Sequence, residues 1–201
     1  KYLKDFDYLL SFDSDGVNSL LSYQKIKQAL NLKIDWSAQF SNQLTYYYDI
    51  FALRSKGWVE ENYKIERDRY LAEGLEPKAA MLKSLSAKMM HINKDKKPIL
   101  VKSAFGGLGI YKINRIDKAK YVGQIKGESV CEHVMFNKKI DEKYPNTLFI
   151  NPKLISGFGL NEHTIFPKIL IYFIPSFIFN YLLRYRQKKR LISLAMIWSK
   201  K

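Results

Sequence analysis

The chain has 201 residues and a single cysteine, Cys131. One cysteine cannot form an internal disulfide, so the sequence has no disulfide framework of the kind that holds small secreted domains together. Cysteine and histidine also form no cluster with the spacing of a structural zinc site. The fold must therefore rest on an apolar core, and a hydrophobic fraction of 47% in a chain of this length is enough to build one.

Acidic residues are few in comparison with basic ones. The 19 Asp and Glu stand against 34 Lys and Arg, which gives a formal net charge of +15 at pH 7. Such a charge favours anionic partners, namely nucleotide phosphates, nucleic acid or an acidic membrane surface. The basic residues are spread along the chain, and neither a zinc-finger spacing nor an RNP signature is present. Nucleic acid is therefore the disfavoured partner of the three.

A long uninterrupted apolar segment is also missing. The most apolar stretch, residues 165–183, contains Pro167, Lys168 and Pro175, and a basic run at 184–190 follows it. A membrane-spanning helix needs about 17–25 predominantly apolar residues. The interruptions favour a helix that lies on the membrane surface, with its basic run on anionic headgroups. A core helix that ends in a solvated basic tail explains the same pattern equally well.

The order of apolar and polar stretches predicts alternating strands and helices, and hence an α/β fold. A strand is expected over 8–12, and a helix within 19–32. Pro77 suits the first turn of a helix that runs to about Ile92. The other expected elements are a partly buried aromatic segment at 45–54, an exposed helix or loop at 60–73, a loop at 94–98, and strands at 99–104 and 110–113 joined by a tight glycine turn at 105–109.

The sharpest motif is Asp13-Ser14-Asp15, which follows the first expected strand. Two carboxylates separated by one residue can project from a turn toward one site. Their hard oxygen atoms suit Mg²⁺ or Mn²⁺, and such a cation neutralises a departing diphosphate. Aspartates are also common in turns for conformational reasons alone, because their side chains cap the backbone.

The same residues fit the nucleophile motif of haloacid-dehalogenase-type phosphatases, in which the first Asp attacks phosphorus and the second acts as acid and base. Those Mg²⁺-dependent enzymes need a later acidic pair at a strand end. The nearest candidate is Asp141-Glu142, which lies in a lysine-rich stretch with no apolar strand before it. This absence counts against the phosphatase.

Four further segments, taken in order with the Asp-x-Asp motif, resemble a group of GT-A glycosyltransferases. The group includes bacterial and viral polysaccharide enzymes and fungal capsule-associated mannosyltransferases. Its members follow the Asp-x-Asp with a YYD-x-x-ALR-like segment, an S-x-FGG-x-x-x-Y loop, a CEH motif and an FINP strand. The matching segments are 47–54 (YYDIFALR), 102–112 (KSAFGGLGIYK), 131–134 (CEHV) and 149–152 (FINP). The ordered set, which covers about 7–163, is more specific than any single motif.

The resemblance implies a role for each matching position. Donor-side residues would bind the nucleotide sugar, and the two aspartates of the Asp-x-Asp would also hold Mn²⁺ or Mg²⁺. The glycine loop would bind the acceptor, although a purely structural turn explains the glycines equally well, and aromatic residues in such runs are more often core. The donor-side positions are Asp13, Asp15, Tyr48 and Asp49, and the acceptor-side positions are Phe105, Gly106 and Gly107.

Glu132 and His133 of the CEH motif have two interpretations. Ser129-Val130-Cys131-Glu132 spells a capping box, so Glu132 can simply cap a helix start. A carboxylate at a helix N-terminus beside a cleft can instead take a proton from an acceptor hydroxyl. The resemblance favours catalysis or acceptor binding for Glu132 and His133.

The two remaining histidines are interpreted differently. His163 follows a glycine-containing loop at 157–162, and the resemblance implies that it completes the metal shell, for which a neutral imidazole suits Mn²⁺. His91 would lie on the amphipathic helix that starts at Pro77, and is expected to be structural.

The resemblance implies a Rossmann-like GT-A fold. In such folds the nucleotide base binds to strands that precede the Asp-x-Asp, and only twelve residues precede Asp13 here. A C-terminal fragment that lacks the first strands is therefore expected, with a catalytic part at 1–163 and an apolar and basic segment at 164–201. The expected function is hexosyl transfer from a nucleotide sugar to a polysaccharide or glycolipid acceptor, in the cytoplasm and at the membrane periphery. A non-catalytic membrane-binding domain stays open as a further alternative.

Overall fold

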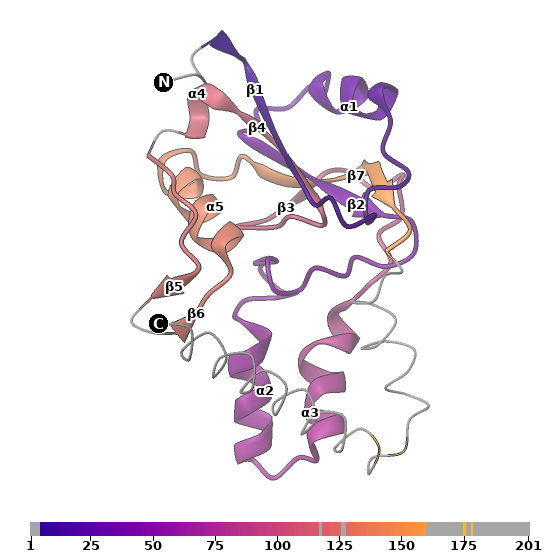
Figure 1. Cartoon of the computed structure of the whole chain (residues 1–201), viewed down its shortest axis with the longest axis vertical. Coiled ribbons are helices and arrows are strands. Elements are labelled where there is room, and N and C mark those ends of the chain that lie inside the picture. Colours follow the sequence, from indigo (N-terminus) through magenta and orange to yellow (C-terminus); the bar gives the residue numbers. More distant parts are fainter. Residues whose placement is uncertain (1–4, 117, 126–127, 160–174, 176–177, 179–201) are drawn as a thin grey trace, which may run out of the picture.

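The computed structural model describes residues 5–116, 118–125 and 128–159, together with Pro175 and Ile178. Within this part of the chain, five strands form a mixed sheet in the order β1-β4-β2-β7-β3 (Figure 1). β4 is antiparallel to β1 and β2, β7 is parallel to β2, and β3 is antiparallel to β7. β1, β2 and β7 therefore end at the same edge of the sheet. The strands are β1 (Tyr8–Phe12), β2 (Ala38–Gln43), β3 (Ile99–Leu100), β4 (Leu108–Lys112) and β7 (Leu148–Gly157).

The side chains of β4 alternate between two apolar clusters, because successive residues of a strand point to opposite faces. Leu108 and Ile110 pack with Ala29 of helix α1 (Tyr23–Leu30). Tyr111 packs edge-on against Phe136 of helix α5 (Glu132–Lys143), with ring centroids 5.3 Å apart. The sheet is thus covered by α1 on one face and by α5 on the other, which confirms the α/β class.

The remaining elements lie away from the centre of the sheet. Figure 1 shows α2 and α3 side by side as a helical pair that extends below the sheet. The elements are α2 (Tyr63–Ala72), α3 (Pro77–Ser84), the short 3₁₀ helix η2 (Ser86–Lys88), α4 (Ile113–Ile116) and the hairpin strands β5 (Gln124–Ile125) and β6 (Glu128–Ser129). No helix in the described residues is long and apolar enough to cross a membrane. The segment 164–201 lies outside the described residues except for Pro175 and Ile178.

Several predictions that depend only on residues close together in sequence are confirmed. β1 occupies residues 8–12 as expected, and Pro77 is the first residue of α3. The exposed helix expected within 60–73 is α2, which has no buried residue. In the aromatic segment 45–54, Tyr47 and Ile50 are fully buried.

The single helix expected from Pro77 to about Ile92 is wrong. α3 ends at Ser84, and the residues directly after η2 form no helix, so His91 lies outside any helix and is exposed. Its Nδ1 lies 2.7 Å from the carbonyl oxygen of Thr45. Tertiary contacts explain the break, because Met89 and Ile92 are buried in the core and the Met90 carbonyl accepts a hydrogen bond from the Tyr47 amide.

The hairpin expected between 99–104 and 110–113 is also wrong. β3 contains only Ile99 and Leu100 and pairs with β7, whereas β4 lies between β1 and β2. The strand at 108–112 is almost entirely buried, and partners on both sides satisfy more of its backbone than one local hairpin partner would.

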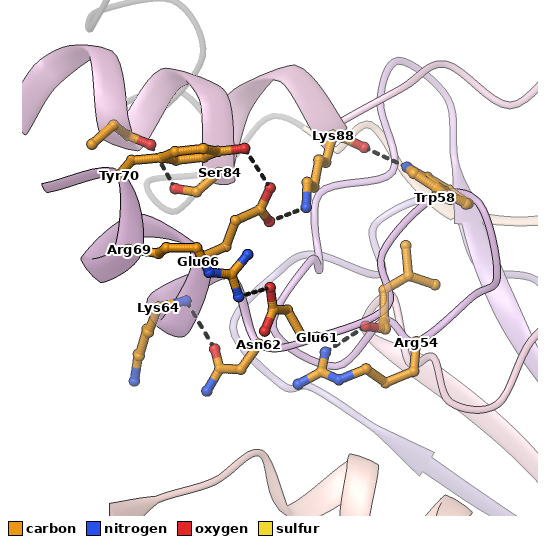
Figure 2. A network of polar contacts seen from close by, with 12 residues as sticks. Arg54, Trp58, Glu61, Asn62, Lys64, Glu66, Arg69, Tyr70, Ser84 and Lys88 are labelled. Carbon is orange, nitrogen blue, oxygen red and sulfur yellow. Dashed lines mark hydrogen bonds and ion pairs between the residues drawn. The ribbon is translucent and has the colours of Figure 1, made fainter. Parts of the chain in front are cut away.

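The α2–α3 pair is connected to the core through the carboxylate of Glu66 (Figure 2). This carboxylate accepts a hydrogen bond from Tyr70 Oη at 3.0 Å and pairs with the ammonium of Lys88. The Glu66 and Lys88 side chains are only 12% and 18% exposed. The Lys88 carbonyl accepts from Trp58 Nε1 at 2.8 Å, and Trp58 packs edge-on against Tyr47. The ion pair therefore links α2 to a segment anchored in the core.

Glu66→Ala is expected to lower the free energy of unfolding by about 2–4 kcal/mol, because it leaves the ammonium of Lys88 unpaired in a largely buried position. Asp68→Ala is the matched control, since the Asp68–Arg67 pair is more exposed and its loss is expected to cost under about 1 kcal/mol. Urea denaturation of both variants measures the difference. Equal losses would contradict this account of the ion pair.

Candidate functional site

The candidate site lies where the parallel strands end. Asp13 and Asp15 follow β1, and Tyr48 and Asp49 belong to the segment that follows β2. The turn at 105–107 enters β4 at the same edge, because β4 is antiparallel to both neighbours. The carboxyl edge of parallel strands is where open α/β sheets place their ligands.

The turn formed by Phe105, Gly106 and Gly107, here called the glycine turn, is hydrogen-bonded to side chains of β2. Gly106 and Gly107 have φ angles of +66° and +88°, which only glycine adopts readily. The Gly106 carbonyl accepts hydrogen bonds from Ser41 Oγ and Gln43 Nε2, both at 2.7 Å. A Cβ on Gly106 would lie 2.7 Å from the Ser41 carbonyl oxygen. The protein's own atoms fill this space, and acceptor binding by the turn stays a prediction.

The glycine turn contacts the Asp-x-Asp segment through Gly107. The Gly107 carbonyl accepts from the Asp13 amide and from Asn18 Nδ2, each at 2.9 Å. Asn18 Nδ2 also donates to the Asp13 carbonyl at 2.9 Å. Asp13 is half-buried and Asp15 exposed, and Asp15 Oδ1 accepts the Val17 amide at 3.3 Å. The backbone of Asp13 is thus fixed to the turn, and Asp15 also caps its own turn.

Tyr48 lies among the carboxylates of the site. Burial raises the pKa of its phenol well above the usual value, and the negative charges of Asp49, Asp13 and Asp15 raise it further. Its hydroxyl group also lies 3.1 Å from the position that a Cβ on Gly107 would take. Tyr48 therefore stays protonated and can donate a hydrogen bond at neutral pH.

Asp49 contacts the glycine turn directly. Its Oδ2 accepts the Gly106 amide at 3.2 Å, and its Oδ1 accepts the Ala52 amide, also at 3.2 Å. Burial raises the pKa of this carboxyl, and the charge of Glu132 adds to the rise. The two amides and His133 oppose it. Asp49 thus interacts electrostatically with both residues at the start of α5.

Glu132 and His133 are the first two residues of α5, so the expected capping box is wrong. The N-cap is Cys131, which makes no side-chain capping bond. Cys131 is buried in a small cluster with Ala52 and Phe105, and this packing, instead of a Ser129 cap, sets where the helix begins. Burial is the largest cause that raises the pKa of the Cys131 thiol, to about 12, so the thiol is neutral near pH 7.

His133 stacks on the ring of Phe105, with centroids 3.7 Å apart and an interplanar angle of 17°. The ring of Tyr121 meets it edge-on at 5.4 Å. His133 Nε2 lies 4.0 Å from Glu132 Oε1, and the two side chains are 13% and 49% exposed. Burial lowers the pKa of His133, against the charges of Asp49 and Glu132, so the imidazole is predominantly neutral near pH 7.

The predicted metal ligands are two carboxylates on one turn. No group of three or more His, Cys, Asp or Glu side chains in the described ranges is arranged to hold a metal ion. His163 lies outside those ranges. Two carboxylates still fit Mg²⁺, which is commonly held by one or two carboxylates together with substrate phosphates.

The acidic pair that a phosphatase would need is engaged elsewhere. Asp141 and Glu142 lie on α5, not at a strand end. Asp141 Oδ2 accepts from Lys102 Nζ at 2.8 Å, and Glu142 Oε2 accepts from Lys139 Nζ at 2.7 Å.

Sequence reasoning missed the residues that support the turn from beneath. Ser41, Gln43 and Asn18 bind its carbonyls, and Tyr47 Oη accepts the Phe105 amide at 3.1 Å. The available signal was the polar run 41–43 (SNQ), which is fully buried in β2. Buried polar side chains need partners, so such a run in a central strand indicates a site that it supports.

Comparisons of the chain with models of known families, with curated proteins and with solved structures found no match.

Gly107→Ala is expected to destabilise the protein more than Gly74→Ala, by at least about 1 kcal/mol. Both glycines have a φ of +88°, so the backbone penalty is the same. A Cβ at 107 would lie 2.8 Å from Val17 Cγ2, whereas a Cβ at 74 meets nothing within 4 Å. Thermal unfolding of the two variants measures the difference. Equal losses would show that the glycine turn is not tightly packed against the Asp-x-Asp segment.

Proposed function

We propose that this chain is the catalytic part of a metal-dependent GT-A glycosyltransferase, which moves a hexose from a nucleotide sugar to a polysaccharide or glycolipid acceptor. The observation that supports this most is the convergence of three distant motifs on the glycine turn. Asp13 binds Gly107, Asp49 binds Gly106, and His133 stacks on Phe105. A site for donor, metal and acceptor needs such a meeting of segments.

The donor half of the proposed site is acidic, although the chain as a whole carries a charge of +15. Asp13, Asp15 and Asp49 are close enough to Tyr48 to raise its pKa. Carboxylates repel a diphosphate, and a bound cation removes this repulsion. Asp13 and Asp15 are therefore the proposed ligands of Mn²⁺ or Mg²⁺, with His163 as a further predicted ligand. When bound, the cation would stabilise the charge that develops on the leaving diphosphate.

The acceptor half of the proposed site is the start of α5. Glu132 is the accessible group there, since its side chain is 49% exposed and that of His133 only 13%. In a direct displacement, the acceptor oxygen bonds to the anomeric carbon of the donor, and the bond from that carbon to the diphosphate breaks. The electron pair leaves with the diphosphate, and the proton of the acceptor hydroxyl passes to Glu132.

The location of the proposed reaction follows from charge and from the C-terminal segment. The basic run at 184–190 and the net charge favour an anionic membrane surface. A glycolipid or a growing surface polysaccharide would be presented there, on the cytoplasmic side, and peripheral contact would bring the enzyme to it.

The test uses the full-length gene product with a panel of nucleotide sugars, in the presence of Mn²⁺, Mg²⁺ or chelator. Release of nucleoside diphosphate is expected to need the metal, and to fall about a hundredfold or more in an Asp13→Asn, Asp15→Asn double variant. The matched control is Asp5→Asn, Asp7→Asn, because these exposed carboxylates precede the other end of β1. The control variant is expected to keep its activity.

A parallel reaction with a generic phosphomonoester separates the two enzyme classes. Metal-dependent release of inorganic phosphate that is lost in the Asp13, Asp15 variant would replace the transferase by the phosphatase. Silence of both reactions, with donor and acceptor panels supplied, would favour a non-catalytic membrane-binding domain.

A further inference from the structure

Asp49 lies at the junction of the two halves of the site, and the protein already uses both of its oxygen atoms. Oδ1 accepts the Ala52 amide and Oδ2 the Gly106 amide, each at 3.2 Å. A residue whose main task is to bind a donor hydroxyl would keep its carboxylate turned toward solvent. Asp49 instead directs its carboxylate to the backbone of its own segment and of the glycine turn.

The glycine turn connects Asp49 both to His133 and to the Asp-x-Asp segment. Phe105 precedes the amide that Asp49 binds. This residue is only 3% exposed, and its ring stacks on that of His133 with centroids 3.7 Å apart. Gly107 follows that amide, and its carbonyl accepts the Asp13 amide at 2.9 Å. A shift of the Gly106 amide would therefore move both the imidazole of His133 and the backbone of the Asp-x-Asp segment.

We propose that Asp49 is a positioning residue, whose carboxylate fixes the glycine turn and thereby holds His133 beside Glu132 and Asp13 beside the turn. This replaces the expectation from sequence that Asp49 contacts the donor. The role in transfer rests on the proposed function, whereas the positioning itself does not.

The electrostatic surroundings of Asp49 agree with this geometry. The groups that interact with its charge are Tyr47, Tyr48, Arg54, Cys131, Glu132 and His133. Of these, Tyr48 and Cys131 are neutral near pH 7 because burial raises their pKa values. The pKa of Asp49 is raised and that of His133 is lowered, chiefly by burial in both cases.

The position and the pKa of the His133 imidazole also depend on its surroundings. Its Nδ1 is buried and has no hydrogen-bond partner among the described residues, so stacking and charge hold the ring in place. The charge of Asp49 opposes the lowered pKa of His133 more than that of Glu132 does. Removal of the Asp49 charge must therefore lower the pKa of His133 further.

The experiment compares the full-length protein with Asp49→Asn and Glu132→Gln variants by NMR. In Asp49→Asn the new carboxamide can still accept one backbone amide, but it presents its own N–H groups to the other. Amide exchange at Gly106 is therefore expected to accelerate about tenfold in Asp49→Asn and to stay unchanged in Glu132→Gln. The pKa of His133, followed by its imidazole resonances, is expected to fall in both variants and to fall more in Asp49→Asn.

Kinetic measurements distinguish a positioning role of Asp49 from donor binding. In Asp49→Asn the kcat for transfer is expected to fall while the KM for the nucleotide sugar stays the same. A raised KM, with unchanged Gly106 exchange and an unchanged pKa of His133, would overturn the proposal and return Asp49 to the donor site. If the unaltered protein transfers no sugar, the proposed function fails, and the exchange and titration measurements still decide the positioning role.

A measurement on the unaltered protein covers the case in which Asp49→Asn does not fold. The carboxyl carbon resonance of Asp49 is expected to report the titration of His133, because neighbouring charges couple their proton binding. Rapid exchange of the Gly106 amide, which is hydrogen-bonded to Asp49 Oδ2, would overturn the proposal.

Discussion

The close approach of the glycine turn to β2 is the constraint on which the rest of the site depends. Ser41 and Gln43 bind the Gly106 carbonyl from inside the sheet, and a side chain at Gly106 would collide with the Ser41 backbone. Because Gly106 is held this close to β2, the other polar groups of the turn have fixed partners. The Gly106 amide meets Asp49 and the Gly107 carbonyl meets the Asp13 amide. The sheet thereby positions segments that are distant in sequence.

Charge is distributed to match this geometry. The chain is strongly basic, yet acidic side chains gather at the carboxyl edge of β1, β2 and β7. The charges of three of them raise the pKa of Tyr48. On the proposed function, the basic surroundings would draw an anionic nucleotide toward the protein, and Asp13 and Asp15 would hold the cation that neutralises its diphosphate. At the start of α5, which is the proposed acceptor side, the Glu132 side chain is accessible, whereas the less exposed His133 packs on Phe105.

The sequence predicted those features that neighbouring residues decide. β1, Pro77 at the start of α3 and the positive φ angles of Gly106 and Gly107 depend on local sterics and apolar patterning. The proximity of the glycine loop to the Asp-x-Asp motif was also expected, through the resemblance. The pairing of 108–112 with β1 and β2 was not, because partners distant in sequence leave no local signal. The same holds for the start of α5, where burial of Cys131 overrode an apparent capping box.

On the proposed function, Asp13 and Asp15 hold one divalent cation next to the glycine turn. The most direct test is the paramagnetic broadening that Mn²⁺, added with a nucleoside diphosphate, causes in the amide resonances of the full-length protein. Broadening is expected to centre on Asp13, Asp15, Tyr48 and Gly107, while the resonances of α2 stay sharp. Broadening centred elsewhere in the described residues, or broadening that Asp13→Asn with Asp15→Asn leaves unchanged, would contradict this metal site.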